Sequence, residues 1–383
     1  MTQFDTRLSE LSRSEHPPAI SLLIPQAEPG TDGEKARITL ENELAEARAR
    51  LEGLDARDRE TLMAPLDGLH EEVRRYGRGT IAAFRNRERF EVLRTHAPVE
   101  AAVEVANQFL LKPLVSESAR ELEILVLALT LENVRVFRVS RDEMTPLPLS
   151  DNVPQSLEDA VGHEVEHGSL QHHGGGRSTT GARFVGRSSG TEQGIFHGHG
   201  VGKDDRKDEI RTFIARLAKA LGDEPLPELP IVLAGVNFET SMLRSHSSDP
   251  RIVQDALIDM SPDGCTDEEL RQAALGALDS IAEQRRNEAW QRLAEPERIE
   301  LVARDLDDVL RAGVQGKIDT LFVRPEAERR GHYDGQALRL TLDERGPEEL
   351  YNTTVCLTLQ HGGRAYPIPE SEDADLVALL RFA

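Results

Sequence analysis

Short apolar runs alternate with amphipathic stretches in the first third of the chain. Residues 19–25 (AISLLIP) are a continuous apolar run closed by proline, which is typical of a buried strand. From Ile38 to Leu54, apolar residues recur close to the period of a helix. The elements expected here are the strand at 19–25, helices at 34–54 and 57–75, a hairpin whose strands TIAAF and RFEVLRT flank residues 85–88, and a helix at 99–111. They indicate a first α/β domain over residues 1–115.

The middle of the chain opens with two β-rich runs in ELEILVLALTLENVRVFRVS (121–140) that meet at residues 131–133 and predict a hairpin. Residues 204–221 carry apolar side chains at helical spacing after two aspartates, which favour a helix N-terminus. The other elements expected are a helical turn at 156–162, a strand at 229–236 and a short helix after it. The pattern indicates a sheet with covering helices over residues 116–245.

The last part of the chain again mixes helices and strands. Thr266 and Glu269 have the spacing of a capping box, so a helix is expected from Thr266 to about Ala294. The elements expected after it are a helix at 305–312, a strand at 318–323, and strands within YDGQALRLTL and RAYPIP. They indicate a third α/β domain over residues 246–383. The predicted fold class is therefore α/β, with three domains.

A segment rich in glycine, histidine and arginine, residues 168–203, interrupts this alternation. Eleven of its 36 residues are glycine, and the entropy cost of ordering them predicts a mobile loop. Its cations are Arg177, Arg183, Arg187 and Lys203 against one acid, Glu192, a net charge of +3 on a chain that carries −22. Long loops in compact domains are usually functional or disordered. A polyanionic partner is therefore expected at this segment.

The overall composition limits the partners and the setting. The net charge of −22 disfavours non-specific binding to DNA or to an anionic membrane, so only a focal patch could bind RNA. The start MTQFDTRLSE lacks the pattern of a signal peptide, and no stretch approaches the roughly 20 apolar residues of a membrane span. A cytoplasmic location is expected. Cys265 and Cys356 are too few for a disulfide framework and are expected to be buried, reduced thiols. Only six of the 46 cations are lysine, and this composition suggests a salt-rich cytoplasm.

Residues 198–205 (GHGVGKDD) resemble a phosphate-binding loop only in part. The first glycine of the P-loop spacing falls at His197, and the magnesium-binding Ser or Thr is replaced by Asp204. Nucleotide hydrolysis is therefore disfavoured. A weaker anion-binding role for the loop and the helix start stays open.

Half of the twelve histidines lie in or beside the glycine-rich segment: His163, His167, His172, His173, His197 and His199. His163 and His167 are four residues apart, a spacing that aligns them on a helix, yet no third ligand has a fixed spacing. Neither a metal nor a cofactor is expected. On a loop that faces RNA, these imidazoles could stack on bases or donate to phosphates. No set of serine, histidine and acid shows a triad signature in the sequence, so no catalytic residue is assigned.

The order of the blocks resembles the archaeo-eukaryotic class I release factor and Pelota superfamily, and more closely its bacterial, Balon-like members. The similar blocks are ISLLIP (20–25) and residues 107–140, 232–244, 305–323 and 360–369. The resemblance covers nearly the whole chain. It implies an N-terminal decoding-side domain, a central RNase H-like domain with a long Gly-rich loop, and a C-terminal domain resembling kink-turn-binding ribosomal proteins.

The chain departs from the superfamily pattern at two motifs. In the family, the central loop carries Gly-Gly-Gln, which enters the peptidyl-transferase centre and helps water cleave peptidyl-tRNA. Here Gly174-Gly175-Gly176 is followed by Arg177, and no Gly-Gly-Gln occurs in the chain. The stop-codon motif Asn-Ile-Lys-Ser is also missing, and the comparable helix start reads EKARITLEN (34–42). The resemblance thus implies a factor that binds the ribosomal A site, in hibernation or rescue, without reading stop codons.

The expected partner is the ribosome through its ribosomal RNA, and both tRNA and a translational GTPase such as elongation factor Tu stay open as further partners. The residues expected to contact RNA are His172, His173, Gly174, Gly175, Gly176, Arg177, Arg183, Arg187, His197, His199 and Lys203. Two other hypotheses stay open. One is a hydrolase of peptidyl-tRNA or RNA that uses the loop histidines, and the other is a protein-interaction module that has lost ribosome binding.

Overall fold

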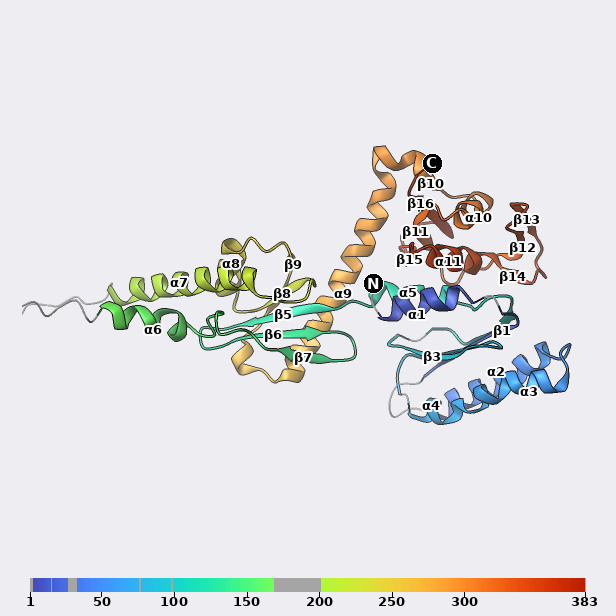
Figure 1. Ribbon diagram of the computed structural model, residues 1–383, viewed down its shortest axis with the longest axis horizontal. Helices are drawn as coiled ribbons and strands as arrows, with labels where there is room; N and C mark the ends of the chain where they lie inside the picture. The colour runs from blue at the N-terminus through green and yellow to red at the C-terminus, as the bar shows by residue number, and fades with distance from the viewer. Residues whose placement is uncertain are drawn as a thin grey trace, which may run out of the picture. The chain divides into compact units, whose positions relative to one another are not determined.

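The computed structural model describes residues 3–382 except residues 15, 27–32, 76, 98 and 169–200. The chain forms two compact units, one made of Met1–Leu122 with Asp279–Ala383 and the other of Glu123–Leu278. Each unit combines helices with sheets, so the predicted α/β class is confirmed (Figure 1). The division falls inside the long helix α9 (Asp267–Gln291).

The first unit begins with an antiparallel sheet in the order β3-β2-β1-β4. Its strands are β1 (Ala19–Pro25), β2 (Thr80–Arg85), β3 (Phe90–Thr95) and β4 (Ala102–Ala106), and its helices are α1 (Gln3–Ser12), α2 (Gly33–Arg50), α3 (Ala56–Asp67) and α4 (Leu69–Arg75). Alternate residues of β1 enter two different cores. Ile20, Leu22 and Ile24 pack with residues of α2, α3 and α4, while Ala19 and Leu23 pack with residues of α1. The predicted strand at 19–25 and the hairpin around 85–88 are confirmed.

The helix predicted at 99–111 is wrong, because this segment contains strand β4. Val103 and Val105 pack against one core of the sheet and Ala102 against the other, a period of two rather than of a helix. Between the valines, the buried Glu104 forms ion pairs with Arg50 at 3.2 Å and with Arg330 at 3.1 Å. Arg330 is distant from Glu104 in the sequence, so local periodicity could not predict this contact.

The C-terminal part of the first unit has two sheets, in the orders β10-β16-β11-β15 and β13-β12-β14. Their strands are β10 (Val302–Ala303), β11 (Ile318–Val323), β12 (Arg330–Asp334), β13 (Arg339–Leu342), β14 (Glu348–Glu349), β15 (Arg364–Pro367) and β16 (Leu376–Leu380), and the helices are α10 (Leu306–Val314) and α11 (Leu350–Gln360). Short 3-10 turns, η3 (Arg292–Ala294) and η4 (Pro296–Leu301), connect α9 to β10. The predicted helix at 305–312 and strand at 318–323 are confirmed.

Residues 107–112 and helix α11 are joined by a buried polar network. Asn352 Oδ1 accepts the backbone N–H groups of Leu111 at 2.7 Å and Lys112 at 3.0 Å, and its amide nitrogen donates to Phe109 O at 2.8 Å. Lys112 Nζ lies 3.2 Å from Glu349 Oε2, with both side chains almost fully buried. The chain is thereby fixed just before η1 (Lys112–Leu114) and α5 (Val115–Arg120).

One apolar core is shared by the two ends of the sequence. It contains Phe84 and Phe109 together with Val309, Tyr351 and Val355. Because of this shared core, residues 1–122 and 279–383 form one compact unit. The sequence patterns predicted separate first and last domains. The division into three domains stays a prediction.

The second unit is built on one sheet with the order β7-β6-β5-β8-β9. Its strands are β5 (Ile124–Leu129), β6 (Val134–Val139), β7 (Met144–Leu147), β8 (Ile231–Gly235) and β9 (Ile252–Asp259), and its helices are α6 (Leu157–Gly168), α7 (Val201–Asp223), α8 (Asn237–His246) and the 3-10 turn η2 (Pro262–Gly264) before α9. The hairpin β5–β6 and its neighbour β7 are antiparallel, whereas β8 and β9 run parallel to β5. An antiparallel meander extended by parallel crossover strands fits the expected RNase H-like fold.

All residues of β5 are buried, so both faces of the sheet are covered. On one face, Leu125, Leu127 and Leu129 pack with Phe213 and Leu217 of α7. Strand β9 is a fifth strand of this sheet that the sequence pattern did not reveal.

The predicted capping box at the start of α9 is confirmed. Thr266 N and Oγ1 donate to Glu269 Oε2 at 2.8 and 2.9 Å, and Glu269 N donates back to Thr266 Oγ1 at 3.2 Å. Helix α9 ends at Gln291, and η3 carries the helical path to Ala294, close to the predicted end.

Candidate functional site

The glycine-rich segment is bracketed by two helices of the second unit. Helix α6 reaches Gly168 and α7 begins at Val201, three residues before the predicted start at Asp204. The backbone of Asp204 therefore still lies in the first turn of α7. Lys203 belongs to α7, but its side chain is outside the described part of the structure.

Most of the predicted RNA-contacting residues fall in residues 169–200, outside the described residues. They are His172, His173, Gly174, Gly175, Gly176, Arg177, Arg183, Arg187, His197 and His199. Their contact with RNA stays a prediction. The backbones of His163 and His167 both lie in α6, which extends beyond the helical turn expected at 156–162, and their side chains are not described.

The two bracketing helices are fixed to each other and to the sheet. Helices α6 and α7 lie side by side (Figure 1). Ala160 of α6 shares the apolar core with Phe213 and Leu217 of α7, and Arg216 Nη1 donates to the carbonyl oxygen of Ala160. The two helices that bracket the segment are therefore packed against each other and against the sheet through Ala160, Phe213 and Leu217.

A groove of about 630 Å³ lies beside the C-terminal half of α7. Arg216 and Lys219 line it, but so do Asp159, Asp223 and Glu224. Ser150 donates to Glu224 through its backbone N–H at 2.9 Å and through its hydroxyl at 2.6 Å. With more acids than cations on its wall, the groove is not suited to a polyanion.

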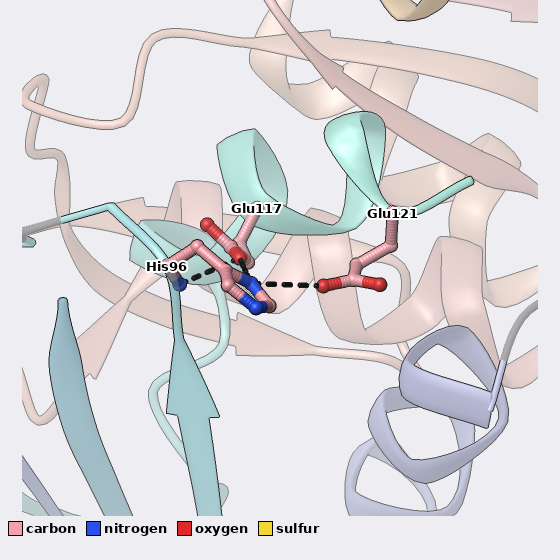
Figure 2. A group of neighbouring side chains, drawn as sticks. All are labelled: His96, Glu117 and Glu121. Atoms are coloured by element: carbon pink, nitrogen blue, oxygen red, sulfur yellow. Dashed lines mark hydrogen bonds and ion pairs between the residues drawn. The ribbon is translucent and has the colours of Figure 1, made fainter. Parts of the chain in front are cut away.

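A separate cluster of potential ligands lies in the first unit, where His96, Glu117 and Glu121 meet (Figure 2). His96 follows directly on β3, Glu117 lies on α5, and Glu121 is the C-terminal cap of α5. Since the two glutamates are four residues apart on a helical turn, both reach the same side. His96 Nδ1 lies 2.8 Å from Glu117 Oε1 and 3.4 Å from Glu121 Oε1.

Glu117 is held in place by the backbone as well as by the imidazole. Its side chain is 2% exposed, and it accepts the N–H of His96 at 2.8 Å and the N–H of Ala97 at 3.3 Å. Burial alone would raise the pKa of this carboxyl group, but the hydrogen bonds and charge of His96 and the N–H of Ala97 together lower the pKa below its usual value. Glu117 is therefore a buried, ionised and oriented carboxylate.

Sequence reasoning missed this cluster. It considered only the histidines near the glycine-rich segment, and His96 is separated from its carboxylates by more than twenty residues. The local signal is the pair Glu117 and Glu121 at helical spacing, a pattern that surface helices also show. Only the folded chain brings His96 beside it.

Both cysteines are free, and Cys356 is buried as expected, whereas Cys265 is only partly buried. Cys356 is unsuited to thiolate chemistry. Burial is the main reason that the pKa of its thiol rises to about 12, and the charge of Glu349 adds to the effect. Within the described residues, no helix is long and apolar enough to span a membrane.

Comparisons with solved structures give matches of low sequence identity. An archaeal translation termination factor, aRF1, is 14% identical, with 99% of this chain and 98% of that chain covered and a TM-score of 0.22. Pelota from Archaeoglobus fulgidus is 13% identical, with 79% and 80% covered and a TM-score of 0.32. Dom34 from S. cerevisiae is 10% identical, with 77% and 74% covered and a TM-score of 0.32.

A search of curated proteins gave no match. The model of a protein family, bacterial archaeo-eukaryotic release factor family 3, matches residues 124–317, just over half of the chain. The matched region begins at β5, contains α6, α7 and the glycine-rich segment between them, and ends just before β11. The chain belongs to bacterial archaeo-eukaryotic release factor family 3.

Proposed function

We propose that this protein binds the ribosomal A site and directs residues 168–203 towards the peptidyl-transferase centre without supplying release chemistry. The observation that carries the proposal is the family match across the central sheet and both bracketing helices. In the superfamily, the loop at this place carries Gly-Gly-Gln. Here Gly174-Gly175-Gly176 is followed by Arg177, so the glutamine that helps water attack peptidyl-tRNA is missing.

The chemistry of the segment supports contact with RNA. Its net charge of +3 contrasts with −22 for the whole chain. Arginines can pair with phosphates of ribosomal RNA or of the tRNA end, and imidazoles can stack on bases. The acidic remainder of the chain would be repelled by RNA, so binding should depend strongly on this segment.

Cosedimentation of the purified protein with ribosomes tests the proposal. Simultaneous replacement of Arg177, Arg183 and Arg187 by alanine should weaken binding and flatten its dependence on salt, by roughly 0.7–0.9 in the log–log slope for each phosphate that the variant no longer neutralises. As a matched control, alanine at Arg138, Arg211 and Lys219 removes three exposed cations from the same unit and should leave the slope unchanged. Failure to cosediment with ribosomes from stationary-phase or stalled cells would show that the proposal is wrong.

A hydrolytic function is the competing hypothesis. The protein should not release the peptide from peptidyl-tRNA in a ribosome-dependent assay, because no Gly-Gly-Gln is present. Hydrolysis that is abolished by His197→Ala would reverse this conclusion. Hibernation and rescue differ in what the ribosome holds, so the presence of mRNA and P-site tRNA in the bound ribosomes would distinguish them.

A further inference from the structure

We propose that His96, Glu117 and Glu121 bind one divalent metal ion of the zinc type, with water completing its coordination. The proposal concerns the first unit and is independent of the ribosomal function. One imidazole nitrogen with two carboxylate oxygens is a ligand set that Zn²⁺ accepts, and three protein ligands plus water is a recurrent zinc arrangement.

The positions of the three ligand atoms support this proposal. His96 Nδ1, an oxygen of Glu117 and an oxygen of Glu121 all lie within 4.8 Å of one another. In a tetrahedral site with metal–ligand distances of about 2.0–2.2 Å, neighbouring ligand atoms lie roughly 3.3–3.6 Å apart. The distance from Nδ1 to Glu121 Oε1 is 3.4 Å, and the distance to Glu117 Oε1 is 2.8 Å. The contact with Glu121 already has the spacing of a tetrahedral edge, whereas Nδ1 and Glu117 Oε1 would have to move apart by about 0.5 Å to admit a cation.

The arrangement of the two carboxylates around one imidazole nitrogen also suits a divalent ion better than a single proton. A single N–H on Nδ1 cannot bond well to both carboxylates, and the 3.4 Å contact with Glu121 is the longer one. A divalent ion contacts both carboxylates and neutralises both charges.

The surroundings supply both orientation and access. The backbone N–H groups of His96 and Ala97 fix Glu117, which resembles the hydrogen bonds that orient ligands around metal ions. The side chain of Glu121 is 15% exposed and that of His96 is 31% exposed. A cation can therefore enter from solvent and keep water in its shell. Once bound, it would tie the turn after β3 to the end of α5 (Figure 2).

Zinc titration of the full-length protein, after removal of metal with EDTA, tests the proposal. The parent for this experiment replaces His163, His167, His172, His173, His197 and His199 by glutamine, so that these histidines cannot compete for the ion. The parent should bind one Zn²⁺, and His96→Gln or Glu121→Gln should weaken binding about a hundredfold or more. Bound Co²⁺ should give the intense visible absorption of a four-coordinate N/O site in the parent and lose it in both variants.

His332 supplies a matched control. Its Nδ1 also lies 2.8 Å from a glutamate oxygen, that of Glu348, but no second carboxylate completes a cluster among the described residues. His332→Gln should therefore leave zinc affinity unchanged. Glu121 lies at the outer edge of the site, so circular dichroism of metal-free Glu121→Gln should match that of the parent. If the parent binds no Zn²⁺ at micromolar concentration, or if His96→Gln and Glu121→Gln both retain full affinity, the proposed site does not exist.

Discussion

Glu43 is a carboxyl group that the fold holds away from water. It lies on α2, is 6% exposed, and neither of its oxygens has a partner in hydrogen-bonding geometry among the described residues. Burial is the main cause that raises its pKa to about 9, the charge of Glu46 adds to the rise, and the nearby N–H of Ala102 opposes it. The folded protein therefore keeps Glu43 protonated at neutral pH.

The raised pKa makes stability depend on pH in a defined direction. In the unfolded chain the carboxyl group of Glu43 titrates near 4.5. The pH-dependent contribution of Glu43 to the free energy of unfolding is therefore fully present below that pH and is lost as the pH rises towards about 9. The loss is at most about 1.4 kcal/mol for each pH unit in this window. Glu43→Gln stays neutral, so the stability of this variant relative to wild type should rise steadily between pH 5 and pH 9.

Urea unfolding at several pH values measures this difference. Glu41→Gln is the matched control, because Glu41 lies on the same helix, is exposed, and pairs with Arg37. Its pH profile should follow that of the wild type. A difference between Glu43→Gln and wild type that stays constant with pH would show that Glu43 does not titrate in this window.

At the scale of elements, the start of α9 gives the clearest local prediction. Thr266 caps the helix and forms reciprocal hydrogen bonds with Glu269. Thr266→Ala removes the side-chain acceptor for the N–H of Glu269 and should lower the free energy of unfolding by about 1 kcal/mol. Thr266→Ser keeps the hydroxyl group and should retain most of the stability. Equal losses in the two variants, measured by chemical denaturation, would contradict a capping role.

Elements that are determined by neighbours along the chain could be predicted from the sequence, and elements that depend on distant contacts could not. The capping box, the hairpin at residues 131–133 and the apolar run at 19–25 are set by neighbours along the chain, and the structure confirms them. Strand β4 could not be predicted this way, because its place is decided by pairing with β1 and by the contact of Glu104 with Arg330. The meeting of His96 with Glu117 and Glu121 is likewise a product of tertiary packing.

The whole molecule presents a contrast between its two units. The core around α7 in the second unit is drawn entirely from residues 123–278. In the first unit, Phe109 and Leu114 share a core with Tyr351 and Val355, and Asn352 satisfies backbone groups of residues 109–112. Separating the ends of the sequence would expose this apolar surface and leave buried polar groups without partners.

Fragments cut from the two units should differ in whether they unfold cooperatively on their own. Residues 1–122 alone should lack a cooperative unfolding transition, whereas a mixture with residues 279–383 should regain one, because the two pieces restore the shared core. Asn352→Ala in the second piece should weaken this association, since it leaves the N–H groups of Leu111 and Lys112 without their acceptor. The fragment 123–278 serves as the control and should unfold cooperatively without a partner. Circular dichroism during urea titration measures all three. Cooperative unfolding of residues 1–122 alone, with a midpoint that residues 279–383 do not shift, would show that the two ends fold independently.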